Sequence, residues 1–418
     1  MPDIIISHPS QRIEGEIALG GSKSITNRAY IIRALCNHDF EITNASQSDD
    51  SRSLLQLLTQ KQGVLDAGHA GTTFRFLTAY LAFKEGSQVL TGSSRMLQRP
   101  IGPLVDALRQ LGANITYLEK EGYPPIRIDE VRRQSNNSVV LPADISSQFI
   151  SALLMIGPTL PDGLEIQLTG ELVSEPYLRM TVDMMAVFGV EVQWENNRLL
   201  VPPQTYQARP YVVEADWSSA SYYFAMAALA KRAKIVLKGL FLPSIQGDSG
   251  IANIAENFGV KTTVDDEGSL IIEKQEDKAP GLFEYDFVQQ PDIAQTVFAL
   301  CAGLGTAGLF AGLQTLRIKE TDRIAAMQQE LAKAGVFLSK VPSRFHKNSE
   351  DELYMQEGKA HFNDIPVFET YHDHRMAMAL APLALLHEIV IRDASVVSKS
   401  YPQFWSDINS LGFETKEA

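Results

Sequence analysis

Two kinds of helix alternate along the chain, and they differ in the spacing of their apolar residues. In one kind, apolar residues recur every three or four positions, as on a helix with one buried face. In the other kind nearly every position is apolar, which is typical of a helix buried on all sides. The second kind is predicted over residues 30–36, 74–83, 149–156, 220–230, 293–304 and 376–386.

Each amphipathic helix is predicted to end at a glycine, which is followed by Ala, Val or Phe and then by β-type sequence. Glycine suits a helix end because it adopts the left-handed backbone conformation without a steric penalty. The strands that follow are hairpin-like pairs, such as 115–118 with 126–128 and 260–264 with 270–272. The helix-ending glycines are Gly63, Gly112, Gly189, Gly259, Gly335 and Gly412.

These elements form six copies of one unit: strand, buried helix, strand, surface helix, glycine and hairpin, with the first copy shortened. Six units predict two compact domains of three units each. Residues 202–214 contain several prolines and little periodicity, which makes them a candidate boundary. Because the N-terminal strands can complete a circle of repeats, we expect residues 1–20 to join 215–418, and residues 21–214 to form the other domain.

The composition is typical of a globular protein, with 45% hydrophobic and 21% charged residues. The longest apolar run, residues 376–386, falls well short of the ~20 residues that span a membrane. The N-terminal sequence lacks the pattern of a secretory signal, so we expect a cytoplasmic protein. Cys36 and Cys301 lie in apolar helices away from other metal ligands, so neither a disulfide scaffold nor a structural zinc site is expected.

The net charge is −13, from 37 basic and 50 acidic residues, which disfavours binding to nucleic acid or an anionic membrane. A small anionic substrate would need a local group of cations. Basic residues do gather at predicted helix N-termini, where they oppose the helix dipole, and a bound anion would offset that unfavourable placement. They are Lys23, Arg28, Arg75, Arg95, Arg99, Lys319, Arg323, Arg375 and Lys399.

Three polar clusters have more than one interpretation. Lys319 and Arg323 are four residues apart, so on a helix they would share a face, with Glu320 beside them as a candidate acid or base. Exposed ion-pair helices show the same pattern. Residues 146–148 predict either a plain helix N-cap or an anion-binding helix start. Residues 372–375 contain two histidines and an aspartate, but not at the spacing of a known zinc motif.

Taken in order, these clusters resemble the 5-enolpyruvylshikimate-3-phosphate synthase family of enolpyruvyl transferases. No one segment is decisive, but nine matching segments in the same order over nearly the whole chain are highly specific. They are residues 21–28, 70–75, 95–102, 146–149, 173–177, 246–248, 291–292, 317–323 and 371–378.

The resemblance implies both a fold and a reaction. The fold would be α/β: a two-domain inside-out α/β barrel, each domain with three βαβαββ-type repeats and buried parallel helices, closing on substrate like a clamp. The reaction would transfer the enolpyruvyl group of phosphoenolpyruvate to the 5-hydroxyl of shikimate 3-phosphate and release phosphate, in chorismate and aromatic amino acid biosynthesis. No metal or organic cofactor and no nucleic-acid or membrane partner is implied, and we expect a monomer.

By matching positions, the resemblance also assigns roles to residues. Asp292 would take the hydroxyl proton, and Glu320 would give and regain a proton at the methylene carbon. Lys23 would stabilise charge and is a candidate proton donor. Addition followed by elimination needs such a base and acid, with cations around two anions. The expected ligands of shikimate 3-phosphate are Lys23, Ser24, Arg28, Ser146, Ser147, Gln148, Ser174, Asp292 and Lys319. Those of phosphoenolpyruvate are Lys23, Gly71, Arg99, Gln148, Arg323, Arg375 and Lys399.

The chain departs from the usual family pattern at His69, Phe76, Thr315 and His372, which leaves glyphosate sensitivity open. Two other functions are considered beside the main one. The transferase that acts on UDP-N-acetylglucosamine is expected to carry a cysteine in the loop that corresponds to residues 91–101, and this loop has none. A non-catalytic homologue would be expected to lose the charged site groups that this chain keeps.

Overall fold

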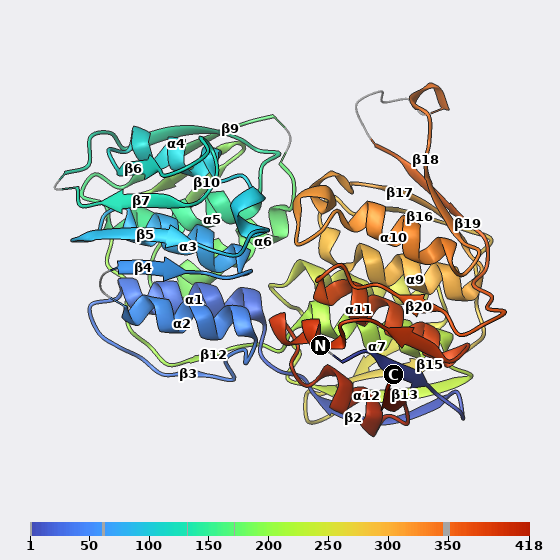
Figure 1. Cartoon of the computed structure of the whole chain (residues 1–418). Coiled ribbons are helices and arrows are strands. Elements are labelled where there is room, and N and C mark those ends of the chain that lie inside the picture. Colours follow the sequence, from blue (N-terminus) through green and yellow to red (C-terminus); the bar gives the residue numbers. More distant parts are fainter. Residues whose placement is uncertain (1, 61–62, 132, 171, 346–351) are drawn as a thin grey trace. The chain divides into compact units, whose positions relative to one another are not determined.

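The computed structural model describes residues 2–60, 63–131, 133–170, 172–345 and 352–418 (Figure 1). The chain divides into two compact units: unit 1 is Met1–Gly20 with Glu214–Ala418, and unit 2 is Gly21–Val213. The sequence-based boundary lay one residue later, at 215. The chain leaves unit 1 once and returns to it once. That the two units act as separate domains stays a prediction.

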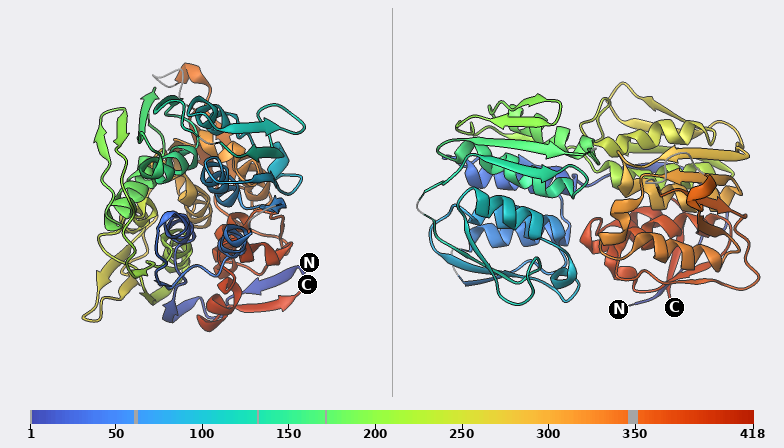
Figure 2. Two further views of the ribbon diagram at one scale, coloured as in Figure 1. Left: turned by 90° about the vertical axis from the view of Figure 1, so that its left-hand side faces the viewer. Right: turned by 90° about the horizontal axis from the view of Figure 1, so that it is seen from above.

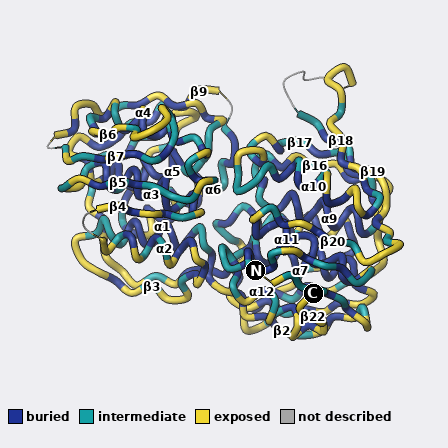
Figure 3. The backbone as a smooth tube through the Cα atoms, viewed as in Figure 1, coloured by how far each residue is buried: buried dark blue, intermediate teal, exposed yellow. Residues whose placement is uncertain are grey.

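Each unit has buried helices inside and amphipathic helices nearer its surface (Figures 1 and 3). In unit 2 the buried helices are α1 (Lys23–Leu35), α3 (Gly71–Leu81) and α5 (Ser147–Ile156), and the amphipathic ones are α2 (Asp49–Thr59), α4 (Gly102–Gln110) and α6 (Glu175–Val187). In unit 1 the buried helices are α7 (Trp217–Leu229), α9 (Ala294–Leu304) and α11 (His374–Leu380), and the others are α8 (Ile251–Glu256), α10 (Arg323–Ala332) and α12 (Phe404–Ser410). Within each unit the buried helices contact one another, and the end-on view of unit 2 in Figure 2 shows strands around them.

The last of the predicted buried helices differs from the observed one. The helix expected over residues 376–386 is α-helical only to Leu380 and continues as the 3₁₀ segment η7 (Ala381–Leu385). Pro382 explains the change, because proline has no N–H for an α-helical hydrogen bond and its ring crowds the preceding turn.

Unit 2 contains two four-stranded sheets and a short two-stranded one among its described residues. In each four-stranded sheet, the two strands that flank a buried helix in sequence are parallel and the other pairs are antiparallel. The orders are β4 (Gly63–Asp66), β5 (Ser87–Thr91), β7 (Ile126–Asp129), β6 (Asn114–Tyr117), and β8 (Ser138–Pro142), β9 (Leu164–Thr169), β11 (Arg198–Val201), β10 (Gln193–Glu195). The short sheet pairs β3 (Ile42–Thr43) with β12 (Tyr211–Val212), which confirms that the first copy is shortened.

The described part of unit 1 contains three four-stranded sheets of the same pattern. They are β2 (Arg12–Ala18), β13 (Arg232–Lys238), β15 (Leu270–Lys274), β14 (Val260–Val264); then β16 (Leu282–Asp286), β17 (Ala307–Ala311), β19 (Tyr354–Glu357), β18 (Phe337–Lys340); then β20 (Val367–Phe368), β21 (Ile389–Ile391), β1 (Ile4–Ser7), β22 (Glu414–Glu417). The N-terminal strand β1 pairs with β21 and β22, and β2 pairs in parallel with β13. The N-terminal strands therefore do complete the circle of C-terminal repeats.

The six glycines predicted to end helices all have positive φ, between 74° and 107°. For Gly63 the prediction is wrong, because α2 ends at Thr59 with Gln60 as its cap and Gly63 begins β4. The chain passes between the units in two short segments, and each segment leads into the start of a buried helix. Strand β2 precedes α1 in sequence but pairs within unit 1, whereas β12 precedes α7 but pairs within unit 2. No helix in the described ranges is long and apolar enough to span a membrane.

Candidate active site

Three carboxylates meet one buried arginine in unit 1. Arg323 is the first residue of α10, and its side chain is 2% exposed. Its guanidinium donates to Asp373 (Nε to Oδ2, 2.8 Å), to Asp292 (Nη1 to Oδ1, 3.0 Å) and to Glu320 (Nη2 to Oε2, 2.7 Å). Three segments that are distant in sequence are therefore held together by a single side chain.

Asp292 also contacts two further cations. It lies in the 3₁₀ segment η4 (Pro291–Ile293) that leads into α9. The Nζ of Lys319 is 3.3 Å from Oδ1, and Nη2 of Arg375 is 3.1 Å from Oδ2. Arg375 also donates through Nη1 to the backbone carbonyl of Asp292 at 3.0 Å. Each oxygen of this carboxylate therefore faces at least one cation.

The cations change the acidity of Asp292. Burial alone would raise its pKa, but Arg375, Lys319 and Arg323 together hold the pKa well below the usual range of a carboxyl group. The pKa of Lys319 is lowered, mainly by burial and against the influence of Asp292. Asp292 is therefore charged but weakly basic here, and a bound anion that drew these cations away would make it a stronger base.

The prediction that Lys319 and Arg323 share a helix face is wrong. The helix α10 begins only at Arg323, and Asp322 caps it by accepting a hydrogen bond from the N–H of Ala325 (3.1 Å). Lys319 and Glu320 come before this cap, directly after the 3₁₀ segment η5 (Gln314–Ile318). The loop places Lys319 beside Asp292 and Glu320 beside Arg323. Helical spacing would not bring the two residues to these partners.

Lys399 lies at the end of the 3₁₀ segment η8 (Ala394–Lys399) and donates its Nζ to the backbone carbonyl of His372 at 2.6 Å. The sequence predicted Lys399 at a helix N-terminus, but the helix that follows it, α12, begins at Phe404. Asp373 caps α11 by accepting from the N–H of Arg375 (2.9 Å). The segment that carries Arg375 is therefore in direct contact with the residue Lys399.

In unit 2, Lys23 is the first residue of α1, and its Nζ is 3.0 Å from Oδ2 of Asp50, in the first turn of α2. Both side chains are largely buried, at 16% and 11% exposed. Lys23 thus has a carboxylate partner that lies 27 positions further along the chain.

Arg28 is a buried cation that is surrounded by neutral oxygens. Nε donates to the hydroxyl of Thr181 (2.7 Å), Nη1 to the carbonyl of Ser24 (3.0 Å), and Nη2 to the hydroxyl of Ser151 (3.2 Å) and the carbonyl of Tyr177 (3.1 Å). Within the described ranges, no ion pair joins Arg28 to a carboxylate. Burial lowers its pKa to about 10, although Tyr177 opposes this. A buried charge without a counter-ion favours the binding of an anion.

Gly71 begins α3 between two arginines. A Cβ atom at this position would lie 2.6 Å from Nη1 of Arg99 and 2.8 Å from Nη1 of Arg75, so only glycine allows both guanidinium groups to lie so close to the backbone. Gln148 accepts from Arg75 (Nη1 to Oε1, 2.7 Å) and donates to Thr72 (Nε2 to Oγ1, 3.0 Å). The expected ligands Gly71, Arg99 and Gln148 are thus gathered around Arg75.

The predicted serines lie at two helix starts. Ser146 is at the N-cap position of α5, but its hydroxyl makes no capping hydrogen bond, so the plain N-cap interpretation is wrong. Ser147 is the first residue of the same helix. Ser174 precedes α6 in the left-handed conformation, with φ of 59°. Hydroxyl groups that do not cap their helix could bind a ligand at these sites.

The sequence did not identify three residues of these clusters as candidate site residues. Asp373 lay in the segment 372–375 that was considered as a metal site, and its real contact is with Arg323. Asp50 has no sequence signal, because its partner Lys23 is distant along the chain. Arg75 was noted among the cations only. In the described parts of the chain, no group of three or more His, Cys, Asp or Glu side chains is arranged to hold a metal ion.

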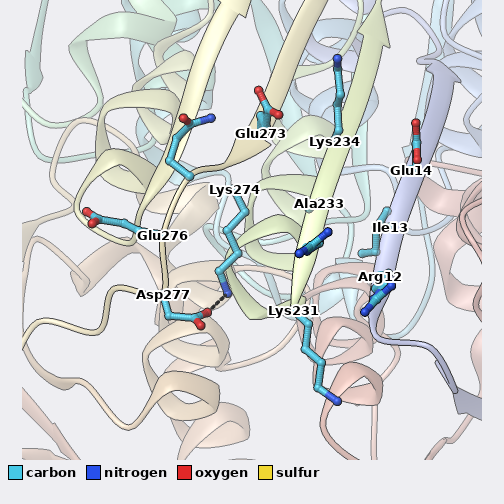
Figure 4. A pocket seen from close by; sticks show the side chains of 12 residues that line it. Arg12, Ile13, Glu14, Lys231, Ala233, Lys234, Glu273, Lys274, Glu276 and Asp277 are labelled. Carbon is cyan, nitrogen blue, oxygen red and sulfur yellow. Dashed lines mark ion pairs between the residues drawn. The ribbon is translucent and has the colours of Figure 1, made fainter.

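A separate pocket of about 490 Å³ lies on unit 1, where β2 and β13 begin and β15 ends (Figure 4). None of the expected site residues lines it. Lys274 in this pocket donates to the carbonyls of Ala228 (2.9 Å) and Ala230 (2.6 Å) at the end of α7, and pairs with Asp277 at 2.7 Å. Its ammonium group therefore satisfies carbonyls that the end of the helix leaves open.

Comparisons with known proteins agree with the family resemblance that the sequence suggested. A family model described as EPSP synthase (3-phosphoshikimate 1-carboxyvinyltransferase) matches residues 7–63 and 55–408. A protein of Bacteroides fragilis (strain YCH46) named 3-phosphoshikimate 1-carboxyvinyltransferase is 44% identical over 414 residues, covering 99% of this chain and 98% of that protein. A protein of the same name from Sulfurovum sp. (strain NBC37-1) is 38% identical over 440 residues, covering 96% and 98%.

Solved structures support the fold. The structure of EPSP synthase from Acinetobacter baumannii has a TM-score of 0.78 and 22% identity, and the match covers 100% of both chains. This likeness confirms the expected α/β fold class, a two-domain inside-out arrangement of repeats. Together with the family model and the relatives, it shows that the chain belongs to the EPSP synthase (3-phosphoshikimate 1-carboxyvinyltransferase) family.

Proposed function

We propose that this protein transfers the enolpyruvyl group of phosphoenolpyruvate to the 5-hydroxyl of shikimate 3-phosphate and releases inorganic phosphate. The observation that carries the proposal is the cluster in which the expected base, Asp292, and the expected acid, Glu320, share the guanidinium of Arg323. The names of the relatives favour this acceptor and do not favour UDP-N-acetylglucosamine.

The cluster in unit 1 is suited to addition followed by elimination. In the addition, Asp292 takes the proton of the 5-hydroxyl as its oxygen bonds to C2 of phosphoenolpyruvate, and Glu320, in its protonated form, donates a proton to C3. In the elimination, Glu320 takes a proton back from the new methyl group as the bond from C2 to the phosphate oxygen breaks. Asp292 gives the hydroxyl proton to the released phosphate, so both carboxyl groups return to their starting protonation states. General acid and base catalysis contributes typically 10²–10⁴-fold at such steps.

Substrate binding would activate the base. Without substrates, Arg375, Lys319 and Arg323 stabilise the charge of Asp292 and depress its pKa. Phosphate and carboxylate groups of the substrates compete for the same cations. As those cations turn to the substrates, the proton affinity of Asp292 rises towards the value that a general base needs.

Residues of unit 2 would contribute to the binding of both substrates. Arg28, whose partners in the described ranges are neutral oxygens, supports the binding of shikimate 3-phosphate, with the hydroxyls of Ser146, Ser147 and Ser174 as further ligands. Lys23, Gln148 and the group around Gly71 support the binding of phosphoenolpyruvate. The clamp-like closure, monomeric state and cytoplasmic location that the resemblance and the composition suggest stay predictions.

A phosphate-release assay tests the proposal. The purified protein receives phosphoenolpyruvate with either shikimate 3-phosphate or UDP-N-acetylglucosamine, in buffer that contains a metal chelator. Phosphate release with shikimate 3-phosphate alone is expected. Release only with UDP-N-acetylglucosamine, or with neither acceptor, would overturn the assignment.

A further inference from the structure

Two neighbouring residues before α11 adopt the left-handed backbone conformation, which is unusual for two successive non-glycine residues. Tyr371 has φ of 52° and His372 has φ of 56°. The left-handed region costs an ordinary residue about 1–2 kcal/mol, and a bulky aromatic residue is unusual there. Elsewhere in the described ranges, non-glycine residues with positive φ occur only singly. Contacts must therefore hold this pair in place.

Tyr371 is fastened to α10. Its hydroxyl lies 2.6 Å from Oε1 of Glu330 and 2.7 Å from Oε1 of Gln329. The Glu330 side chain is 0% exposed, and its other oxygen accepts from Lys333 (2.5 Å) and from the N–H of Glu369 (2.9 Å). This anchor is rigid because the buried carboxylate is held from several sides, and α10 is the helix that begins with the site arginine.

His372 is fastened to both ends of η8. Its Nδ1 lies 2.9 Å from Oδ2 of Asp393, which directly precedes η8. Its carbonyl accepts from Nζ of Lys399, the last residue of η8, at 2.6 Å. Asp393 is itself held by its N–H, which donates to Oδ1 of Asp3 at 3.0 Å. The loop therefore connects to η8 through a side chain and through its backbone.

We propose that Tyr371 and His372 are positioning residues for phosphoenolpyruvate binding, an inference that rests on the proposed function. Neither needs to touch the substrate. They connect the last turn of α10 to the loop before α11 and to both ends of η8. Helix α10 begins with the expected ligand Arg323, α11 carries Arg375 and η8 ends with Lys399. Asp373, the residue that follows the pair, contacts Arg323 directly. The strained pair sets the spacing of the three cations.

A loop that served only stability would behave differently from a positioning loop. Its loss would lower the unfolding free energy and leave the KM values of the folded enzyme unchanged. Loss of a positioning loop should raise KM for phosphoenolpyruvate selectively, because the cations it spaces are expected to bind that substrate. Shikimate 3-phosphate has most of its expected ligands in unit 2, so its KM should change little.

The test uses three variants in the full chain. Tyr371→Phe removes only the hydroxyl that contacts α10. His372→Gly removes the imidazole but also relieves the backbone strain, so it should fold even if the tyrosine variant does not. His372→Asn is the conservative variant, because asparagine tolerates the left-handed conformation and keeps a polar side chain.

We expect Tyr371→Phe and His372→Gly to raise KM for phosphoenolpyruvate about tenfold, the equivalent of roughly one hydrogen bond to a charged group. KM for shikimate 3-phosphate should change less than about twofold, and His372→Asn should recover most of the loss. The matched control is Asn196→Gly. Asn196 is also left-handed, with φ of 50°, and its carbonyl also accepts from a side chain, that of Trp194, but it lies in a hairpin of unit 2.

The outcomes separate this inference from the proposed function. If the wild-type protein releases no phosphate from the two substrates, the proposed function fails. If the wild type is active but the variants keep the wild-type KM for phosphoenolpyruvate, the positioning role is overturned. Equal increases in both KM values, or the same increase in Asn196→Gly, would overturn it as well.

Discussion

Arg28 in unit 2 and Arg323 in unit 1 are equally buried, each 2% exposed, but they have opposite surroundings. Arg323 donates to three carboxylates, those of Asp292, Glu320 and Asp373. Among the described residues, Arg28 donates only to hydroxyl and carbonyl oxygens. Within this part of the chain, one buried arginine therefore has carboxylate counter-ions and the other has none.

The pKa values of the two guanidinium groups differ accordingly. Burial lowers the pKa of Arg28 to about 10. Burial would lower the pKa of Arg323 too, but its three carboxylates outweigh burial and raise it. The cluster around Arg323 is electrically compensated before any ligand binds, whereas the positive charge of Arg28 still lacks an anion. We infer that unit 1 supplies proton-transfer groups and that Arg28 serves mainly to bind.

Asp292→Asn should have the largest effect, because it removes the expected base and keeps the shape of the side chain. We expect kcat to fall about 10²–10⁴-fold, with a much smaller change in substrate affinity. Steady-state kinetics with both substrates measures this. Asp322→Asn is a matched control in the same unit, since asparagine can still cap α10. If Asp292→Asn weakened binding as much as it lowered kcat, the assigned role would be wrong.

Arg323→Met should lower the unfolding free energy by about 3–5 kcal/mol, because it leaves buried carboxylates without their main partner. Urea unfolding at neutral pH measures the change. Adding Asp373→Asn to this variant should recover part of the loss, since Asp373 is 0% exposed and its charge is the hardest to leave buried. A loss below about 1 kcal/mol would mean that the cluster is not compensated as we infer.

The repeats of the fold could be predicted because each of their signals is local. The helix-ending glycines, the wholly apolar helices and the hairpins each depend on a few neighbouring residues. The end of α11 was missed because Pro382 was given no weight within an apolar run. The start of α10 was missed because Lys319 and Glu320 have helical spacing from Arg323, but their contacts with Asp292 and Arg323 are tertiary.

The sequence could suggest candidate site residues, but it could not give their geometry. The resemblance selected Asp292, Glu320 and Arg323, which the fold brings into contact. The partner of Lys23 could not be found, because no local pattern connects it with Asp50. The left-handed pair Tyr371 and His372 was missed for a related reason: a bulky tyrosine is unusual in that conformation, and the contacts of the pair are with residues distant in sequence.

Arg28→Met tests the buried arginine that has neutral partners in the described ranges. The unfolding free energy should change by less than about 1–2 kcal/mol, because the neutral partners can satisfy one another. The hydroxyl of Thr181 already lies 2.9 Å from that of Ser151 and 3.0 Å from the carbonyl of Tyr177. Affinity for shikimate 3-phosphate should fall about 10–100-fold, as expected for a lost charged hydrogen bond. Calorimetric titration measures this, and a loss of stability as large as that of Arg323→Met would contradict the comparison.

Substitution of Glu352 should have the smallest effect on stability. We expect this because exposure to solvent weakens the ion pairs of a carboxylate. Its carboxylate contacts Lys340 (2.5 Å) and Arg317 (3.0 Å) near the surface. The hydrogen bond from Lys340, helped by Arg317 and opposed by burial, lowers its pKa from 4.5 to about 2. Because the folded-state pKa is the lower one, the stabilisation is complete above about pH 4.5 and is lost as the pH falls towards 2.

Glu352→Gln should therefore lower the unfolding free energy by only about 0.2–1 kcal/mol at neutral pH, the range of exposed ion pairs. The difference from wild type should shrink as urea unfolding is repeated at pH values from about 5 down to about 3, because Glu352 of the unfolded wild type takes up a proton in this range while Glu352 of the folded protein stays ionised. A difference that stayed constant over this range would mean that the carboxylate charge does not stabilise the fold. A difference as large as that of Arg323→Met would mean that burial is not what separates the two clusters.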